Sequence, residues 1–569
     1  GDRGQPCMPE VWGAPHCQAL GALAVTGACA LAALLSWRAV RAARALPARE
    51  AHGGSIVHSA AAGVECTTHS PRTYAAPDLE DLAGDGLAGA EARPEPLGVG
   101  KVQLRARPAA RGLQAKRGLC AEEEECLEGT EGFAAPHLPG RQRVFVKTFG
   151  CPHNQSDGEY MMGQLREYGY TLVDSLEACD ALVINSCNVK QPAETRALNL
   201  VTNAQQAGKR IVLAGCLPSS ERKLAESLED VSMLDVTQLD RVVEVVEECI
   251  KGHTVKLLEK KRGLPSLALP KVRKNKSAEI ITINAGCLGN CTYCKTKFSR
   301  GKVASYAIDD IVRRAEQAVS EGVYQIELAS EDMGAYGIDI GTNIVELMLR
   351  LSDTVPPNVM IRTGMTNPPY ILHHVDGIVE ALKRHNFHAF MHIPVQSGSD
   401  KVLQSMRREY TVGEFSCLVD RLKSALPDLF LLTDVICGFP AESEEDWEAT
   451  MALARRYKFH GIHISQFYAR PGTAAARMKP LKSHVGKDRY RQLADYVTTY
   501  NRNEGLEGCE ERVWFSGTDE EHHQTVGRTK AFAKVVVPRD DALLGRSAAV
   551  QLGAASRQHV EGQVVGEVL

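Results

Sequence analysis

The sequence has no overall excess of basic residues. Its 66 lysines and arginines are outnumbered by 70 aspartates and glutamates, and the formal net charge is -4. Proteins that attract nucleic acid through their whole surface are strongly basic. That class is therefore excluded, and any RNA-binding surface of this chain must be local. At 569 residues the chain is too long for one hydrophobic core, so we expect three or four domains.

An even set of cysteines in a short secreted chain, the usual mark of a disulfide framework, is also missing. There are 17 cysteines, an odd number, in a long chain of ordinary globular composition. We interpret them as reduced thiols and metal ligands in a reducing compartment.

Long uncharged apolar runs are rare, and the one that stands out is Ala19–Trp37. Its 19 residues are about enough to cross a bilayer as a helix. Arg38, Arg41 and Arg44 follow, which would place the C-terminal side in the cytosol. We expect a cytosol-facing membrane anchor of the endoplasmic reticulum type. The alternative is a transit peptide removed on import, with the protein in an organelle, or a cytoplasmic protein. The leader, residues 1–140, has few aromatics and no sustained period, and we expect Ala45–Gly140 to be mostly disordered.

Residues 141–252 alternate between short buried strands and helical stretches. The segments "RVFVKTF", "ALVINS" and "RIVLAGC" predict three strands of a parallel sheet covered by helices. Each strand is followed closely by a cysteine: Cys151, Cys187 and Cys216. Because the carboxyl ends of parallel strands meet at one edge, these thiols are expected to come together there. Each could instead be a small buried residue, but three together favour a metal site.

A basic linker, residues 253–276, leads into a second α/β region at 277–503. Six apolar segments recur there with helices between them, which predicts a partial (β/α)6 barrel. The pattern of the tail, residues 504–569, indicates short strands joined by turns. It predicts a small antiparallel β-barrel, a fold that often binds oligonucleotides, although an ordinary packing domain is the alternative.

The stretch "NAGCLGNCTYC" after the first barrel strand holds Cys287, Cys291 and Cys294, with no fourth cysteine nearby. A structural zinc site needs four ligands. Three thiolates would hold a four-iron cluster with one iron open. The amino group and carboxylate of S-adenosylmethionine can chelate such an iron, and reduction then breaks the sulfonium bond to give a carbon radical.

Several motifs together show that the chain resembles the radical S-adenosylmethionine methylthiotransferase family from about Arg141 to its end. The resemblance rests on "GCLGNCTYC", "TFGCPHNQSDGE", "NSCNVKQPAE", "AGCLP", "HIPVQSGSD", "MRREYT" and "QFYARPGT". The segments "CTYCKTKFSRG", "SEDMGAYG" and "GMTNPPYIL" are most similar to the eukaryotic and archaeal threonylcarbamoyladenosine tRNA branch. One departure is Ala441, where the family usually has glycine.

The resemblance implies methylthiolation of C2 of N6-threonylcarbamoyladenosine at position 37 of tRNA. It implies two [4Fe-4S] clusters, one held by Cys151, Cys187 and Cys216 and the other by Cys287, Cys291 and Cys294. It further implies S-adenosylmethionine, an electron donor, a sulfur source, and a TRAM-like RNA-binding tail. The alternatives are a ribosomal-protein methylthiotransferase and a non-catalytic iron–sulfur RNA-binding protein.

Further polar residues fall at strand ends of the predicted barrel. Ser330 and Glu331 end the second strand, and Gln396 and Ser397 end the fourth. We interpret these four as cofactor-binding candidates, with loop hydrogen bonding as the alternative. The basic residues of the linker, around Lys271–Lys276, and those of Lys295–Lys302 are expected to form the local RNA-binding surface together with the tail.

Overall fold

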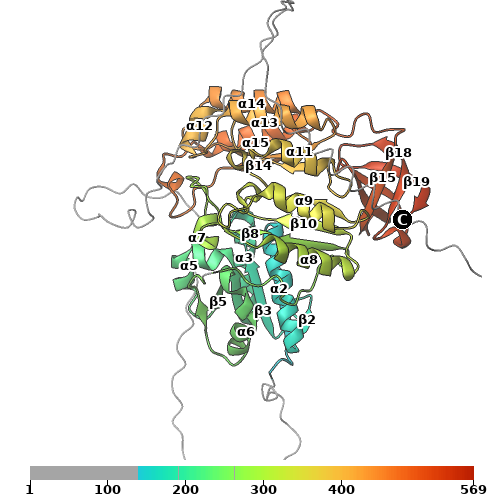
Figure 1. Ribbon diagram of the computed structural model, residues 1–569. Coiled ribbons are helices and arrows are strands. Elements are labelled where there is room, and N and C mark those ends of the chain that lie inside the picture. The colour runs from blue at the N-terminus through green and yellow to red at the C-terminus, as the bar shows by residue number, and fades with distance from the viewer. Residues whose placement is uncertain (1–138, 190, 262) are drawn as a thin grey trace, which may run out of the picture. The chain divides into compact units, whose positions relative to one another are not determined.

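The computed structural model describes residues 139–569, apart from 190 and 262 (Figure 1). The apolar segment 19–37 and almost all of the predicted leader lie outside the described residues. Among the helices that are described, none combines the length and the apolar character needed to cross a membrane.

The first region is a six-stranded parallel sheet with the strand order β2-β1-β3-β4-β5-β6. Its central strand β3 is buried on both faces, which explains why it reads as an unbroken apolar run. The strands are β1 Arg143–Thr148, β2 Thr171–Val173, β3 Ala181–Ser186, β4 Arg210–Gly215, β5 Ser232–Asp235 and β6 Lys256–Leu257. The helices are α2 Pro152–Tyr168, α3 Gln191–Gln206, α4 Cys216–Ser220, α5 Arg222–Ser227, η2 Val236–Arg241 and α6 Val242–Ile250.

The sheet separates two hydrophobic cores. Val183 packs with α2 and α6 on one face, and its neighbour Ile184 packs with α3 on the other. The three predicted strands are confirmed. The short strands β2, β5 and β6 were not predicted, because two to four residues are too few to show a period.

The second region holds six parallel strands. Two three-stranded sheets, β7-β10-β11 and β12-β13-β14, are joined by parallel bridges from Ile361 to Phe387 and from Met365 to His392. This arrangement confirms the predicted six strand–helix units. The strands are β7 Ala278–Thr282, β10 Gln325–Ala329, β11 Met360–Arg362, β12 Phe390–His392, β13 Phe430–Cys437 and β14 Gly461–Gln466, with a small hairpin of β8 Asn284–Ala285 and β9 Ala304–Ser305.

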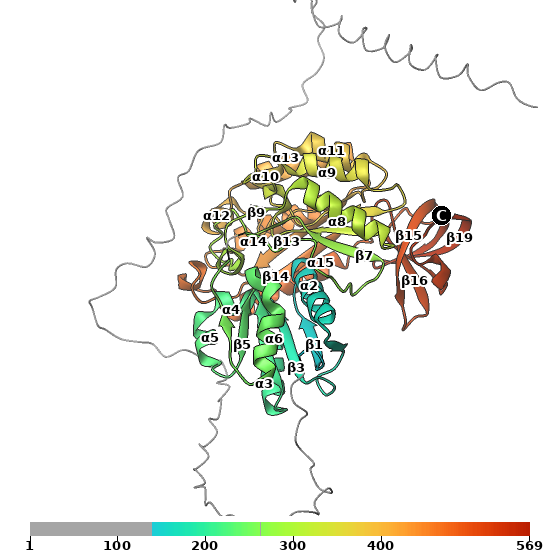
Figure 2. The same cartoon turned by 60° about the horizontal axis from the view of Figure 1, so that its bottom comes forward.

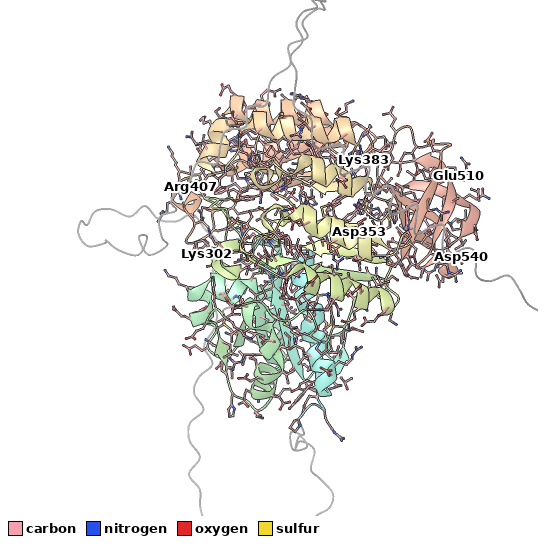
Figure 3. All side chains as sticks on the ribbon, in the orientation of Figure 1. Lys302, Asp353, Lys383, Arg407, Glu510 and Asp540 are labelled. Carbon is pink, nitrogen blue, oxygen red and sulfur yellow. The ribbon has the colours of Figure 1, made fainter. Side chains whose placement is uncertain are left out.

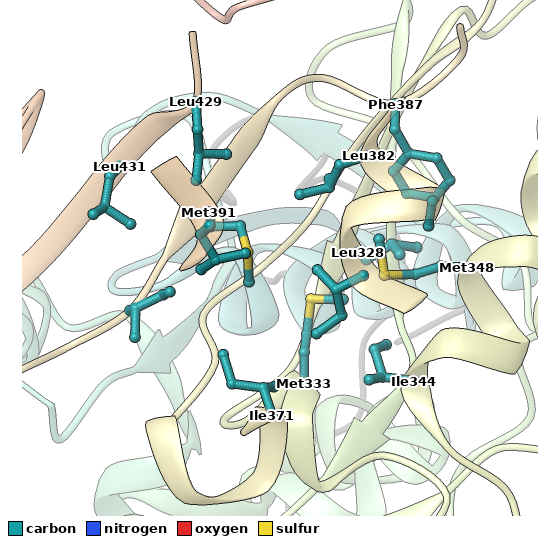
Figure 4. Packing of buried hydrophobic residues seen from close by; sticks show 14 of the residues in the cluster. Leu328, Met333, Ile344, Met348, Ile371, Leu382, Phe387, Met391, Leu429 and Leu431 are labelled. Carbon is teal, nitrogen blue, oxygen red and sulfur yellow. The ribbon is translucent and has the colours of Figure 1, made fainter. Parts of the chain in front are cut away.

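Most helices of this region cover the outer side of these strands. The helices are α7 Thr296–Arg300, which packs against α4 and η2 instead, α8 Ile308–Ser320, α9 Ile344–Thr354, α10 Pro368–Ile371, α11 Val375–Lys383, α12 Asp400–Ser405, α13 Val412–Ala425, α14 Glu444–Tyr457 and α15 Ser483–Val497, with the short turns η3 Met333–Ala335 and η4 Ala475–Arg477. Figure 2 shows α8, α9, α11 and α13 side by side in one layer. Between helices and strands, Leu328, Met333, Met391 and Leu431 point into one core (Figure 4).

The position where the family usually has glycine follows β13. Ala441 there adopts a φ of 75°, in the left-handed region that favours glycine. The left-handed backbone at Ala441 therefore explains why the family usually has glycine at this position.

The C-terminal region is a closed five-stranded barrel with the order β15-β16-β17-β19-β18. The predicted barrel is confirmed, but it is mixed rather than antiparallel, because β17 pairs in parallel with β19. After β17 the chain forms a 3-10 turn, η5, and then strand β18, which pairs with β15. The last strand, β19, lies between β18 and β17 and closes the barrel. The elements are β15 Glu510–Asp519, β16 Gln524–Thr529, β17 Lys534–Pro538, η5 Asp541–Leu543, β18 Ser547–Ala555 and β19 Val560–Val568.

Helix α2 joins the first two regions. The Ser156 hydroxyl donates to the Ile280 carbonyl of β7 at 3.1 Å. A side chain at Gly163 would meet the Pro270 carbonyl oxygen at 2.1 Å, so only glycine allows this close approach.

The second region also contacts the small C-terminal barrel. The Ala389 amide donates to the Lys530 carbonyl of that barrel at 2.8 Å.

Candidate cysteine-lined active site

One cavity contains both sets of predicted ligand cysteines. Its volume is about 950 Å³, at the upper end of the range of ligand pockets. Six cysteines contribute to its wall: Cys151, Cys187, Cys216, Cys287, Cys291 and Cys294. The first three come from the strand ends of the N-terminal sheet and the others from the loop after β7, so the two sets face a common space.

The N-terminal cysteines meet where β1, β3 and β4 end. Gly150 has a φ of 111°, and a side chain there would lie 2.6 Å from the Cys187 sulfur, so glycine is needed beside this thiol. The Asn154 amide donates to the Ser186 carbonyl at 2.8 Å and fixes the loop. Burial raises the pKa of Cys151 to about 11 and that of Cys216 to about 12. These thiols keep their protons until a metal displaces them.

The second set lies on a tight loop. The Cys287 amide donates to the Gly301 carbonyl at 3.2 Å, and the Cys294 amide donates to the Cys291 carbonyl at 3.2 Å. A side chain on Gly289 would lie 3.7 Å from the Cys287 sulfur and 3.8 Å from the Cys291 sulfur. Glycine therefore keeps the space between two thiols open. Burial raises the pKa of Cys287 to about 12.

Both sets fit an iron–sulfur cluster by their chemistry. Each offers three thiols within one loop or strand-end cluster, and thiolates are the soft ligands that iron–sulfur clusters use.

Arg408, in the segment "MRREYT", is a further functional candidate. Its guanidinium donates to the Cys291 sulfur at 3.1 Å and to the Tyr410 hydroxyl at 3.2 Å. A positive charge at this distance stabilises a thiolate or a negatively charged cluster. The contact could not be predicted, since 117 residues separate the two partners.

A buried ionic network joins the two cysteine sets. Arg300 contacts Asp157 at 2.5 Å and Glu331 at 3.0 Å, and the His153 ring lies 2.7 Å from Glu331. All four side chains are nearly inaccessible, with 4 to 11% exposure. The network crosses from α2 to the loop after β10, so it holds the first two regions together around the cavity.

The structure contradicts the predicted RNA-binding surface for three of its cations, whereas Lys274 and Lys276 of the linker are exposed as expected. Arg300 is buried in ion pairs, Lys295 is buried against Glu221, and Lys271 is 1% exposed between Glu159 and Glu279. These cations are neutralised inside the protein and cannot contact phosphates. Lys302, by contrast, is exposed (Figure 3).

Replacing Arg300 tests how much the network stabilises the protein. The Arg300→Met variant leaves Asp157 and Glu331 buried without their cation, which is expected to cost on the order of 3–5 kcal/mol. The midpoint of denaturant unfolding should fall accordingly. The matched control Lys302→Met removes the same charge from an exposed neighbour and should shift stability by less than about 0.5 kcal/mol. Equal midpoints for the two variants would show that the network is not stabilising.

The four predicted cofactor-binding residues divide into two groups by their position relative to the cavity. Ser330, Glu331 and Gln396 line the cavity, and Gln396 has a φ of 67°. Glu331 also accepts the Gly286 amide at 3.1 Å, which ties it to the cysteine loop. Ser397 is completely buried, and its hydroxyl lies 3.4 Å from that of Thr450, away from the cavity wall.

A His–Asp–His group lines the cavity further along the strands. Asp434 Oδ1 lies 2.7 Å from His392 Nε2 and 3.0 Å from His463 Nδ1. Burial alone would raise the pKa of Asp434, but the two imidazoles outweigh burial and hold it well below its usual range. Alternation along β13 and β14 could have placed Asp434 and His463 on the inner face.

Two family descriptions match this chain. Residues 143–235 match "Uncharacterized protein family UPF0004", and residues 281–454 match "Radical SAM superfamily". The two matches cover the two regions that supply the cysteines.

Curated relatives match over most of their length. The threonylcarbamoyladenosine tRNA methylthiotransferase of Xenopus laevis is 43% identical over 445 residues, covering 77% of this chain and 80% of that protein. The human protein of that name is 44% identical over 76% of this chain and 75% of its own. The probable enzyme of Methanothermobacter thermautotrophicus is 35% identical over 71% of this chain and 92% of its own.

Proposed function

Because this chain belongs to the threonylcarbamoyladenosine tRNA methylthiotransferase family, we propose that it adds a methylthio group to C2 of N6-threonylcarbamoyladenosine at position 37 of tRNA. The observation that carries the proposal is the single cavity shared by six cysteines from two regions. The transfer needs a radical at the base and a sulfur donor beside it, and this cavity offers ligands for both.

The radical S-adenosylmethionine region implies one [4Fe-4S] cluster and S-adenosylmethionine. We assign Cys287, Cys291 and Cys294 to this cluster, supported by the open space around Gly289. When bound, the cluster and the cofactor supply a radical that can remove hydrogen from an unactivated carbon. The protein's share is to hold the ligands, to exclude water, and to balance charge through Arg408.

We assign Cys151, Cys187 and Cys216 to a second [4Fe-4S] cluster, supported by their convergence at the strand ends. When bound, this cluster would be the place where the sulfur is delivered. Arg300 lies close enough to Cys216 and Cys151 to counter the pKa increase that burial causes in both thiols. It would therefore favour the thiolate forms that ligate iron.

For S-adenosylmethionine we propose contacts with Ser330, Glu331 and Gln396, supported by their position in the wall of the same cavity. Ser397 would instead support the Gln396 loop from behind, through its contact with Thr450. The implied partners are tRNA, an electron donor and a sulfur source.

Mass analysis of tRNA nucleosides tests the function directly. Cells lacking the protein should lose the methylthio derivative and accumulate N6-threonylcarbamoyladenosine. Returning the wild-type gene should restore the derivative, and a Cys291→Ala gene should not, because that cysteine is a proposed cluster ligand. An unchanged level of the methylthio nucleoside in the deletion strain would overturn the tRNA assignment and favour a ribosomal-protein substrate.

A further inference from the structure

The far end of the cavity has an aromatic wall built from two regions. Along β13, the alternate residues Phe430, Leu432 and Asp434 all line the cavity, so it extends along the inner face of the strand. At its end, Phe532 of the small barrel packs against Phe390 and Phe430, with ring centroids 4.6 Å and 5.5 Å apart. Phe532 has a φ of 66°, so the turn between β16 and β17 holds this ring at a conformational cost.

Two arginines lie against this wall. The guanidinium of Arg528 in β16 is 4.1 Å from the Phe532 ring centroid. That of Arg362, at the end of β11, is 5.5 Å from the Phe390 centroid and 5.7 Å from the Phe532 centroid. A guanidinium held by its face on an aromatic ring keeps edge N–H groups available for a planar anion.

The positive charge of Arg528 is only partly balanced. Arg362 is paired with Glu327, but Arg528 forms no ion pair with any residue in the described range 139–569. Its guanidinium donates to the Phe532 carbonyl at 3.0 Å. Burial and the neighbouring Arg362 lower the pKa of Arg528 to about 10, and the charge of Glu327 opposes them only in part. An arginine kept in such surroundings without a paired anion favours a ligand that brings one.

The proposed substrate carries one such group on its modified base. The threonine of N6-threonylcarbamoyladenosine ends in a carboxylate, whereas an unmodified or alkylated adenosine has no charge there. We propose that Arg528 binds this threonine carboxylate, with Phe390, Phe430 and Phe532 enclosing the side chain and Arg362 reinforcing the positive potential. The inference rests on the proposed function and adds the residue that selects the substrate. A neutral N6 substituent leaves Arg528 half-buried and without an ion-pair partner, so the site disfavours it.

The test uses the reconstituted full chain and three synthetic anticodon stem-loops. They carry at position 37 the threonylcarbamoyl base, its neutral methyl ester, or plain adenosine. Binding is measured anaerobically for wild type, Arg528→Met, Arg528→Lys and the control Arg546→Met. Arg546 is exposed in the same small barrel and does not line the cavity. Iron content and the circular dichroism spectrum of each variant verify that it is folded.

We expect wild type and Arg546→Met to bind the acid more tightly than the ester by on the order of 30-fold or more. Arg528→Met should bind acid and ester equally, and Arg528→Lys should keep part of the preference. If Arg528→Met retains the full preference, or weakens all three RNAs by the same factor as a phosphate contact would, the inference is overturned. Failure of the proposed function looks different: wild type would then form no methylthio product on the threonylcarbamoyl RNA.

Discussion

The Cys291→Ala variant is expected to form no 5′-deoxyadenosine above the level of a protein-free control. Cys291 is one of only three thiols on its loop, and its sulfur accepts the Arg408 contact, so its loss removes both a ligand and the point where charge is balanced. A cluster left with two protein ligands should not assemble. Iron content should fall from about eight atoms per chain to about four. Both quantities are measured after anaerobic reconstitution, with reductant and S-adenosylmethionine.

Cys437→Ala is the matched control. Cys437 ends β13, is completely buried and does not line the cavity. This variant should retain full iron content and full cofactor cleavage even if its stability falls. Cofactor cleavage that survives in Cys291→Ala would contradict the assignment of this loop to the radical cluster.

The Cys187→Ala variant should separate the two half-reactions. The thiol follows β3 at the edge of the N-terminal sheet, so its loss removes a ligand of the second cluster and leaves the loop of Cys287 unchanged. We expect 5′-deoxyadenosine formation to continue and methylthio product to disappear. Liquid chromatography with mass detection of both products, from one reaction with threonylcarbamoyl stem-loop RNA, measures the separation.

Cys249→Ala provides the comparison for this variant, because Cys249 is buried in α6 of the same region and lies away from the cavity. It should make both products. If Cys187→Ala made methylthio product at the wild-type rate, the N-terminal cysteines would have only a structural role.

The cysteine positions were predictable because they follow from strand topology. Parallel strands bring their carboxyl ends to one edge, and Cys187 and Cys216 each follow a strand directly. The apolar segments that mark β3 and β13 are long enough to show their period or their continuous burial. The fold class and the convergence of each cysteine set could therefore be predicted.

The burial of several basic residues could not be predicted from the sequence. Arg300, Lys295 and Lys271 resemble a solvated cationic surface in the sequence. Their partners are distant in the chain: Arg300 pairs with Asp157, 143 positions away, and Lys295 with Glu221, 74 positions away. Burial of a charge depends on such long-range pairing, which leaves no local pattern.

The linker, residues 253–276, also limits where the chain can be divided. Glu279 on β7 is completely buried and meets Lys271, Arg273 and Arg314, and two of these three cations precede residue 277. A fragment starting at 277 would keep the carboxylate and lose most of its compensation, while the preceding fragment would lose the contact of Ser156 in α2 with Ile280 in β7. We therefore expect the two cysteine-bearing regions to unfold as one cooperative unit. Chimaeras of related enzymes should therefore exchange both regions together.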